Sequence, residues 1–210
     1  MFNTIINKTP IEGVLQISFD RFTDERGYFS EKLRVNDLPF LKDTNNIVQL
    51  NESYSTGCVI RGLHFQWSPY MGKIVRAIQG EIYDMVVDIR KGSPTYGKGL
   101  IYKLSSSLED KQDNMLWAPP GFAHGFFSLN DCLIDYYCTG QYSKPTESNI
   151  SPLAPDIDWS LANPKYLELF KSIQPKATIT DKDRNGNTMK SWLESAESEN
   201  FIFNLEGNNE

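Results

Sequence analysis

Short runs of apolar or alternating residues, separated by turn-forming residues, constrain the fold of this 210-residue chain most strongly. The breaks between the runs are rich in Gly, Pro, Ser and Asn, as in KGSPTYGKG and PPG. Many short strands separated by such turns are typical of an antiparallel sandwich or barrel. The sequence has no βαβ pattern and no GxGxxG motif, so a dinucleotide-binding parallel sheet is not expected. The predicted strands are residues 14–19, 46–50, 59–65, 73–79, 81–89, 100–104, 115–118 and 132–138.

Helices are expected to be few and to lie near the C-terminus. The sequence LANPKYLELFKS, residues 161–172, predicts an amphipathic helix because its apolar residues gather on one face. From about residue 184 the chain is polar and rich in Asn and Glu, which favours a short helix followed by a frayed end. We therefore expect a single domain over residues 1–210, with a core at about 14–185 and a polar extension at 186–210.

The composition excludes several classes of function. Hydrophobic residues make up 40% of the chain, but no run approaches the roughly 18 apolar residues that a membrane span needs. The first residues, MFNTIINKTP, do not resemble a signal peptide, and the three cysteines form no CxxC pair. We therefore expect reduced thiols in a cytoplasmic protein. The net charge of −6 argues against a nucleic-acid-binding protein, although an arginine-lined pocket for a phosphate-bearing small molecule is compatible with it.

The sequence RGLHFQ, residues 61–66, places a rare histidine inside a predicted strand. The chain has two histidines, and His64 is one of them. Alternate side chains of a strand share a face, so we expect His64 to point the same way as Gln66 and Arg61 to point the opposite way. If the His64 face lines a barrel interior, an imidazole projects into a cavity. The alternative is a core histidine whose nitrogens are hydrogen-bonded.

The second histidine follows a rigid turn. His124 lies in WAPPGFAHGFFSL, where two prolines and a glycine precede an aromatic run. Such a turn can hold a functional side chain in a fixed direction, although packing on the neighbouring rings explains the residue equally well. A metal site needs three or four ligands, commonly with two histidines close in sequence, and this chain has no HxH pair. We therefore expect no metal.

Three further segments contain residues suited to binding or to proton transfer. In DERGYFSE, residues 24–31, Arg26 can grip a phosphate with two hydrogen bonds, and the aromatic rings can stack on a base. A solvated strand edge is the alternative for this segment. In DYYCTGQY, Tyr136 and Tyr142 are candidate proton donors or ordinary strand aromatics. The segment TDKDRNG, residues 180–186, indicates on its own a polar turn.

These segments, in this order, resemble the dTDP-4-dehydrorhamnose 3,5-epimerase family. The resemblance implies an all-β fold, a cupin-like double-stranded β-helix (jelly-roll barrel) with a few short, mainly C-terminal helices. It also implies an enzyme that needs no metal and no cofactor, and a homodimer in which an exchanged N-terminal segment contributes to the partner's site. The matching pieces, over roughly residues 14–185, are DERGYFSE, VQLNES, VIRGLHFQ, GKIVRA, VVDIRKGSPTYGK, PPGFAHGFFSL, the tyrosine pair and the DKD turn.

The resemblance also implies roles for individual residues. His64 would be the base that removes a proton next to the sugar ketone, Asp183 its dyad partner, and Tyr136 the acid that returns a proton. These roles fit the chemistry, because inversion needs a base and an acid on opposite faces of the ring, and histidine titrates near neutral pH. The positions that match the sugar, diphosphate and nucleotide sites are Arg26, Glu31, Gln49, Asn51, Arg61, Lys73, His124, Tyr142, Glu147 and Lys182.

The implied function is a cofactor-independent epimerase that inverts C3 and C5 of a dTDP-4-dehydro-6-deoxyhexose through an enolate, in deoxysugar and O-antigen polysaccharide biosynthesis. Departures from the family pattern, such as Tyr137 in place of a lysine and Met71 in place of a glutamine, leave the nucleotide and the number of inverted centres open. The alternatives are an epimerase of C3 or C5 alone and an epimerase for a CDP- or GDP-linked sugar. A 3,4-ketoisomerase or a non-catalytic sugar-nucleotide-binding cupin is less favoured.

Overall fold

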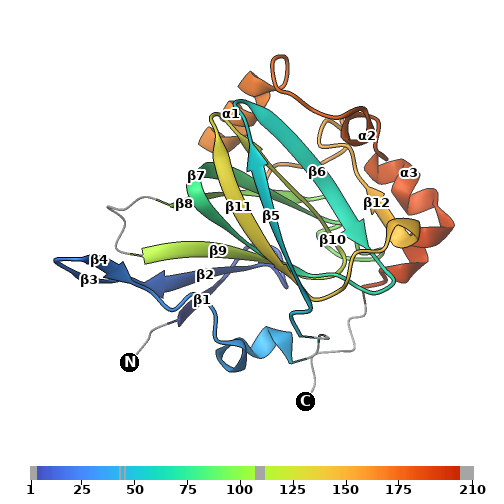
Figure 1. The fold of residues 1–210 in the computed structure, drawn as a ribbon. Coiled ribbons are helices and arrows are strands. Elements are labelled where there is room, and N and C mark those ends of the chain that lie inside the picture. The colour runs from blue at the N-terminus through green and yellow to red at the C-terminus, as the bar shows by residue number, and fades with distance from the viewer. Residues whose placement is uncertain (1–3, 43, 45, 107–111, 204–210) are drawn as a thin grey trace.

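Two antiparallel sheets that share one long strand form the body of the molecule (Figure 1). The computed structural model describes residues 4–42, 44, 46–106 and 112–203. The first sheet contains β1 (Thr4–Lys8), β2 (Leu15–Asp20), β9 (Gln112–Ala118), β11 (Cys132–Cys138), β5 (Gln49–Ser55) and the first half of β7 (Lys73–Asp88). The second sheet contains β12 (Glu147–Asn149), β6 (Val59–Gln66), β10 (Phe122–Ser128), β8 (Gly99–Ser106) and the second half of β7.

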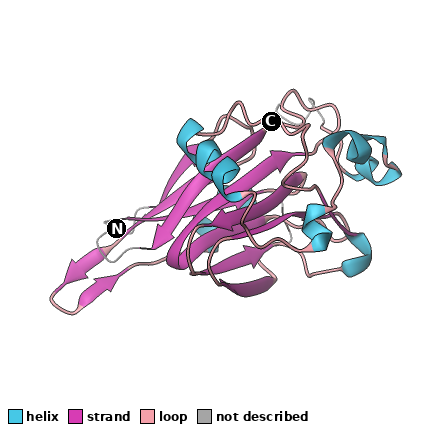
Figure 2. Ribbon diagram, turned by 90° about the horizontal axis from the view of Figure 1, so that it is seen from above, coloured by secondary structure: helices cyan, strands magenta, loops and turns pink. Residues whose placement is uncertain are grey.

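A hairpin and several short helices lie outside the two sheets. The hairpin consists of β3 (Phe22–Asp24) and β4 (Gly27–Phe29) and projects away from the barrel (Figures 1 and 2). The α-helices are α1 (Pro164–Ile173), α2 (Asp181–Arg184) and α3 (Met189–Glu194). The 3₁₀-helices are η1 (Val35–Asp37), η2 (Pro39–Leu41), η3 (Lys144–Thr146) and η4 (Ala196–Asn200). The expected all-β fold with a few short, mainly C-terminal helices is confirmed.

Strand β7 passes from one sheet to the other at Gly80. The sequence predicts two strands here, residues 73–79 and 81–89, whereas the structure has one strand of 16 residues. Gly80 has a φ of +78°, and a Cβ at this position would lie 2.6 Å from the carbonyl oxygen of Asp131. Only glycine fits this corner without strain. The glycine that suggested a turn therefore bends one continuous strand.

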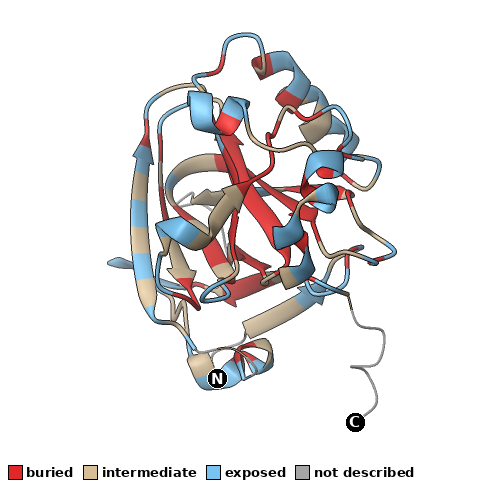
Figure 3. Cartoon of the chain, turned by 90° about the vertical axis from the view of Figure 1, so that its right-hand side faces the viewer, coloured by how far each residue is buried: buried red, intermediate tan, exposed pale blue. Residues whose placement is uncertain are grey.

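Both faces of the second sheet are covered, which explains the long apolar runs of its strands. Ile82 and Val86 of β7 belong to the hydrophobic cluster between the two sheets. Met85, which lies between them in sequence, packs instead with Phe170 of α1 and Trp192 of α3 on the outer face. The central strands are therefore buried on both sides (Figure 3).

The C-terminal segment differs from the frayed end that its polar sequence predicts. The predicted short helix is present as α3, and η4 follows it. Trp192 is 2% exposed and Phe201 is 5% exposed, and both rings contact Phe65 of β6. Two large aromatic side chains thus hold this polar segment on the barrel as far as residue 203; residues 204–210 lie outside the described part of the chain.

The element boundaries differ slightly from the predicted ones. Helix α1 begins at Pro164 rather than at residue 161, because the side chain of Asn163 accepts a hydrogen bond from the backbone of Lys165 and caps the helix. Strand β5 spans Gln49–Ser55, whereas the sequence predicts a strand at residues 46–50. The predicted strands did not include β1, β3, β4, β10 and β12.

Candidate active site

Two adjoining cavities open between the sheets, and three predicted site residues line both of them. The larger cavity has a volume of about 500 Å³ and the smaller one about 190 Å³. His64, Lys73 and Tyr136 line both cavities and therefore lie where the two meet. His64 comes from the second sheet, and Tyr136 comes from β11 of the first. The two side chains thus approach the cavity from opposite sheets.

Arg61 and His64 line the same cavity, so the prediction that they point to opposite faces is wrong. The pairing of β6 with β10 shifts by one residue directly after His124. Such an irregularity moves the following side chains to the other face of a strand. Gly62 and Gly125 meet at the shift: Gly62 has a φ of +110°, and a Cβ on it would lie 2.6 Å from the Cα of Gly125. Two glycines in contact thus bring the arginine to the side of the histidine.

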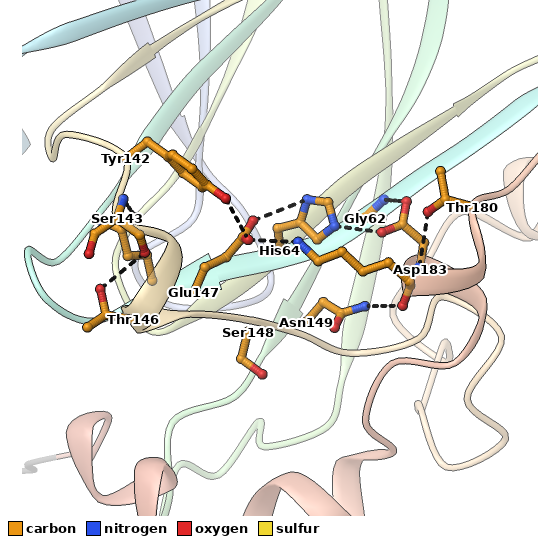
Figure 4. Close-up of polar contacts among 12 residues, drawn as sticks. Gly62, His64, Tyr142, Ser143, Thr146, Glu147, Ser148, Asn149, Thr180 and Asp183 are labelled. Atoms are coloured by element: carbon orange, nitrogen blue, oxygen red, sulfur yellow. Dashed lines mark hydrogen bonds and ion pairs between the residues drawn. The ribbon is translucent and has the colours of Figure 1, made fainter.

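His64 and Asp183 form a hydrogen-bonded pair, although 119 positions separate them in the sequence. Nε2 of His64 lies 2.7 Å from Oδ1 of Asp183 (Figure 4). A carboxylate can only accept, so Nε2 carries the hydrogen and Nδ1 keeps the lone pair. Helix α2 holds the carboxylate in place: Thr180 caps the helix, and the backbone N–H of Gly62 donates to Asp183 at 3.3 Å.

The pKa of Asp183 is lowered by its hydrogen bonds. Burial alone raises this pKa, but the hydrogen bond and charge of His64, with further hydrogen bonds from Gly62 and Thr180, outweigh burial. The carboxylate is therefore ionised at neutral pH. An ionised carboxylate on Nε2 fixes the tautomer of the imidazole and stabilises the imidazolium that forms when Nδ1 takes up a proton.

Glu147 stands on the other side of the His64 ring. Its Oε1 lies 4.0 Å from Nδ1 of His64 (Figure 4). Its Oε2 accepts hydrogen bonds from Nζ of Lys182 at 2.7 Å and from the hydroxyl of Tyr142 at 3.2 Å. These contacts bring together four of the predicted site residues. The imidazole thus lies between two carboxylates, Asp183 and Glu147.

Lys73 and Tyr136 are suited to donate hydrogen bonds or protons within the cavity. Desolvation lowers the pKa of the Lys73 ammonium, while Cys138 and nearby carboxylates oppose this shift. Burial raises the pKa of Tyr136, and Cys138 raises it further, while a hydrogen bond with Asn51 lowers it. The phenol therefore keeps its proton at neutral pH. A protonated phenol and an ammonium of lowered pKa thus face the same cavity as the His64 imidazole.

A second histidine–carboxylate pair, which includes a residue that was not predicted, adjoins the smaller cavity. Nε2 of His124 lies 2.7 Å from Oδ1 of Asp84, which is fully buried in β7. His124 lines the smaller cavity, and its Cα pairs with that of His64 across the strands. Asp84 was missed by the sequence analysis. Its signal was an acidic residue inside the apolar run EIYDMVVDI, where an unpaired carboxylate is costly.

The remaining predicted residues divide into two groups. Gln49 and Asn51 line the larger cavity, where Nε2 of Gln49 donates to Oδ1 of Asn51 at 2.9 Å. Arg26 and Glu31 do not line either cavity of their own chain. Arg26 lies on the projecting hairpin with its side chain 85% exposed and paired with Asp24, whereas Glu31 pairs with a neighbouring arginine.

The described residues form neither a metal-binding cluster nor a membrane-spanning helix. No group of three or more His, Cys, Asp or Glu residues in the described part of the chain is arranged to hold a metal ion. No helix in residues 4–42, 44, 46–106 and 112–203 is long and apolar enough to cross a membrane.

Comparisons with known proteins agree on one family. The family model described as dTDP-4-dehydrorhamnose 3,5-epimerase matches residues 8–191. The dTDP-4-dehydrorhamnose 3,5-epimerase of Methanothermobacter thermautotrophicus is 40% identical over 188 residues, which cover 87% of this chain and 93% of that protein. The enzyme of the same name from Shigella flexneri is 41% identical over 186 residues, which cover 85% of this chain and 92% of that protein.

The fold is also similar to that of a solved enzyme. The crystal structure of the dTDP-6-deoxy-D-glucose-3,5-epimerase of Legionella pneumophila, in complex with dTDP-4-keto-L-rhamnose, superimposes with a TM-score of 0.77. The two chains are 34% identical, and the match covers 93% of this chain and 97% of the other.

Proposed function

Because this chain belongs to the dTDP-4-dehydrorhamnose 3,5-epimerase family, and is therefore an enzyme of the isomerase class, we propose that it converts dTDP-4-dehydro-6-deoxy-D-glucose to dTDP-4-dehydro-L-rhamnose. The reaction inverts C3 and C5 of the sugar. We assign this reaction to deoxysugar biosynthesis in the cytoplasm, which would supply the sugar for O-antigen polysaccharide. The observation that supports the proposal most strongly is the convergence of His64, Lys73 and Tyr136 on one cavity.

The chemistry requires a base, a donor to oxygen and an acid. A C–H bond next to a ketone is a weak acid because the electrons it leaves behind spread onto the carbonyl oxygen as an enolate. Nδ1 of His64 takes the proton, and the Asp183 carboxylate stabilises the resulting imidazolium. Lys73 donates to the oxygen on which negative charge develops, an effect typically worth about 2.7–4 kcal/mol per donor. Tyr136 then returns a proton to the opposite face of the carbon.

The other cavity residues are assigned to the substrate, with Gln49 and Asn51 at its nucleotide and the rest at its sugar and diphosphate. Arg61 stands beside His64 and suits the diphosphate, because a guanidinium binds phosphate oxygens with two parallel hydrogen bonds. Gln49, Asn51, Tyr142, Glu147 and Lys182 line or adjoin the larger cavity and are assigned to substrate contacts, as is His124 in the smaller one.

Arg26 and Glu31 are assigned to the site of a partner subunit. The hairpin that bears Arg26 projects away from its own barrel (Figure 1), and this arginine lines neither cavity of its own chain. The large side chains of Phe22 and Phe29 on this hairpin are 45% and 61% exposed. Exposed aromatic residues of this kind mark interaction surfaces. We therefore propose a homodimer with exchanged N-terminal segments.

The test of the base is His64→Ala. This variant should lose inversion and also lose exchange of the sugar C–H protons with deuterated water, by about 10²–10⁴-fold or more. Proton NMR of the sugar nucleotide reports both quantities. Full inversion by a folded His64→Ala variant would overturn the proposal.

Turnover should also survive exhaustive chelation, because Lys73 rather than a metal ion polarises the ketone. A loss of turnover with EDTA that a divalent ion restores would contradict this assignment.

A further inference from the structure

Each inversion leaves the proposed base and acid in the wrong protonation states. His64 has gained a proton from one face of the sugar carbon, and Tyr136 has lost one to the other face. Inversion of a second carbon therefore needs a neutral His64 and a protonated Tyr136 again. The proton on His64 must leave for the solvent, and the tyrosinate must take one up. This requirement rests on the proposed function, and it applies before each new inversion.

In the described part of the chain, Glu147 lies beside the nitrogen of His64 that this proton has to leave. Nε2 of His64 is occupied by Asp183 at 2.7 Å, so the abstracted proton arrives on Nδ1. Oε1 of Glu147 lies 4.0 Å from that nitrogen. Catalytic hydrogen bonds are often long in enzymes without substrate and shorten in the complex. Shortened in the same way, this contact lets the Glu147 carboxylate accept a hydrogen bond from the protonated nitrogen.

The contacts of Glu147 lead outward from the cavity. The exposed fraction of the side chain is 30% for His64, which opens to the cavity that the sugar would fill, 13% for Glu147 and 54% for its partner Lys182. Tyr142, the second partner, is 55% exposed as a residue. Both partners bind the same oxygen, Oε2, whereas Oε1 faces His64. One oxygen therefore faces the base, and the other is tied to groups that reach solvent (Figure 4).

We propose that Glu147 transfers the proton from Nδ1 of His64 to solvent and so resets the base between inversions. The steps balance: the C–H bond breaks, its electrons go to the enolate and its proton goes to Nδ1. The enolate carbon then takes the phenolic proton of Tyr136. The imidazolium passes its proton to Oε1 of Glu147, the carboxyl releases it to water, and the tyrosinate takes a proton from water. In this step Glu147 acts on His64 and does not react with the sugar.

The test compares turnover of Glu147→Gln with that of the natural protein at increasing concentrations of imidazole buffer, at constant pH and ionic strength. Glutamine keeps the shape of the side chain but cannot accept and release a proton. Without added buffer, steady-state turnover should fall about 10–10²-fold, mainly in kcat, whereas the first inversion in each site should keep its rate and appear as a burst. Small buffer molecules should restore steady-state turnover. The natural protein should be insensitive to buffer.

Two control variants separate this role from a structural one. Glu52→Gln removes another carboxylate that lines the same cavity and should show no buffer dependence. Glu147→Asp keeps a carboxylate and should restore turnover without buffer. Three results for Glu147→Gln would each overturn the inference and leave the epimerase activity standing. These are the absence of a burst, a loss of turnover that buffer does not restore, and a change confined to KM. A natural protein that inverts no carbon would overturn the proposed function, and this inference with it.

Discussion

His64 and Tyr136 reach the cavity from opposite sheets, and in the proposed mechanism this arrangement separates the removal of a proton from its return. The two steps leave different traces in deuterated water. Removal alone causes exchange of the sugar C–H proton, whereas return from the far side causes inversion. The division of labour between the two residues can therefore be measured one residue at a time.

The substitution Tyr136→Phe should uncouple the two steps. His64 still removes the proton and exchanges it with solvent, but no acid stands on the far face, so exchange should persist while inversion falls about 10²–10⁴-fold. Proton NMR of the substrate in deuterated water measures both rates. Equal losses of exchange and inversion in this variant would show that the role given to Tyr136 is wrong.

The substitution Asp183→Asn should change how stability depends on pH. The pKa of Asp183 in the folded protein lies below the usual 3.8, so the stabilisation that it provides is fully present above that pH. This stabilisation is lost as the pH falls through the lowered pKa. The cause is that Asp183 takes up a proton more readily in the unfolded state, where its pKa is higher, than in the folded state. The free energies of unfolding of the two proteins should therefore differ above about pH 5 and converge in more acidic solution. A difference that stays constant down to the acid transition would contradict the lowered pKa.

In both histidine–carboxylate pairs, the sequence alone indicated the histidine but not the carboxylate. His64 and His124 attracted attention because the chain has two histidines. Asp183 lies 119 positions from His64, in a segment that resembles an ordinary polar turn, so only the family resemblance singled it out. Asp84 carried a local signal, an acid among apolar strand residues, that the resemblance did not use.

Local sequence patterns predicted the strands and helices better than any other feature, and their one clear failure has a physical reason. Alternation predicted most of the strands, because each strand must bury one face or both. It failed within β6, since the register shift there depends on contact between Gly62 and Gly125 of a different strand. A pattern read along one strand contains no information on its neighbour.

The C-terminal segment offers a test at this scale. Trp192→Ala in α3 should reduce the free energy of unfolding by about 3–5 kcal/mol, because the indole is 2% exposed and packs against Phe65 and Phe201. The adjacent Leu193 is 38% exposed, so Leu193→Ala is a matched control that should change stability by no more than about 0.5 kcal/mol. Denaturant titration measures both. Equal and small effects would show that the segment is only loosely attached to the barrel.

For the whole molecule, the proposed exchange of N-terminal hairpins makes each active site a product of two chains. Arg26→Ala and His64→Ala should each be nearly inactive as homodimers. In a mixed dimer, one site combines His64 of one chain with Arg26 of the other and is complete. Co-expression of the two variants should therefore restore about a quarter of the natural activity when dimers form at random. Background activity in purified mixed dimers would mean that Arg26 does not serve the partner's site.

The proposed activity is the inversion of two carbons of a dTDP-linked 4-keto sugar by proton exchange with solvent. The most direct test follows dTDP-4-dehydro-6-deoxy-D-glucose with the natural protein in deuterated water by proton NMR. We expect a product with the L-rhamno configuration and deuterium at both C3 and C5. Deuterium at one carbon only would show that the protein is a mono-epimerase. A bound but unchanged substrate, with no deuterium at either carbon, would contradict the account.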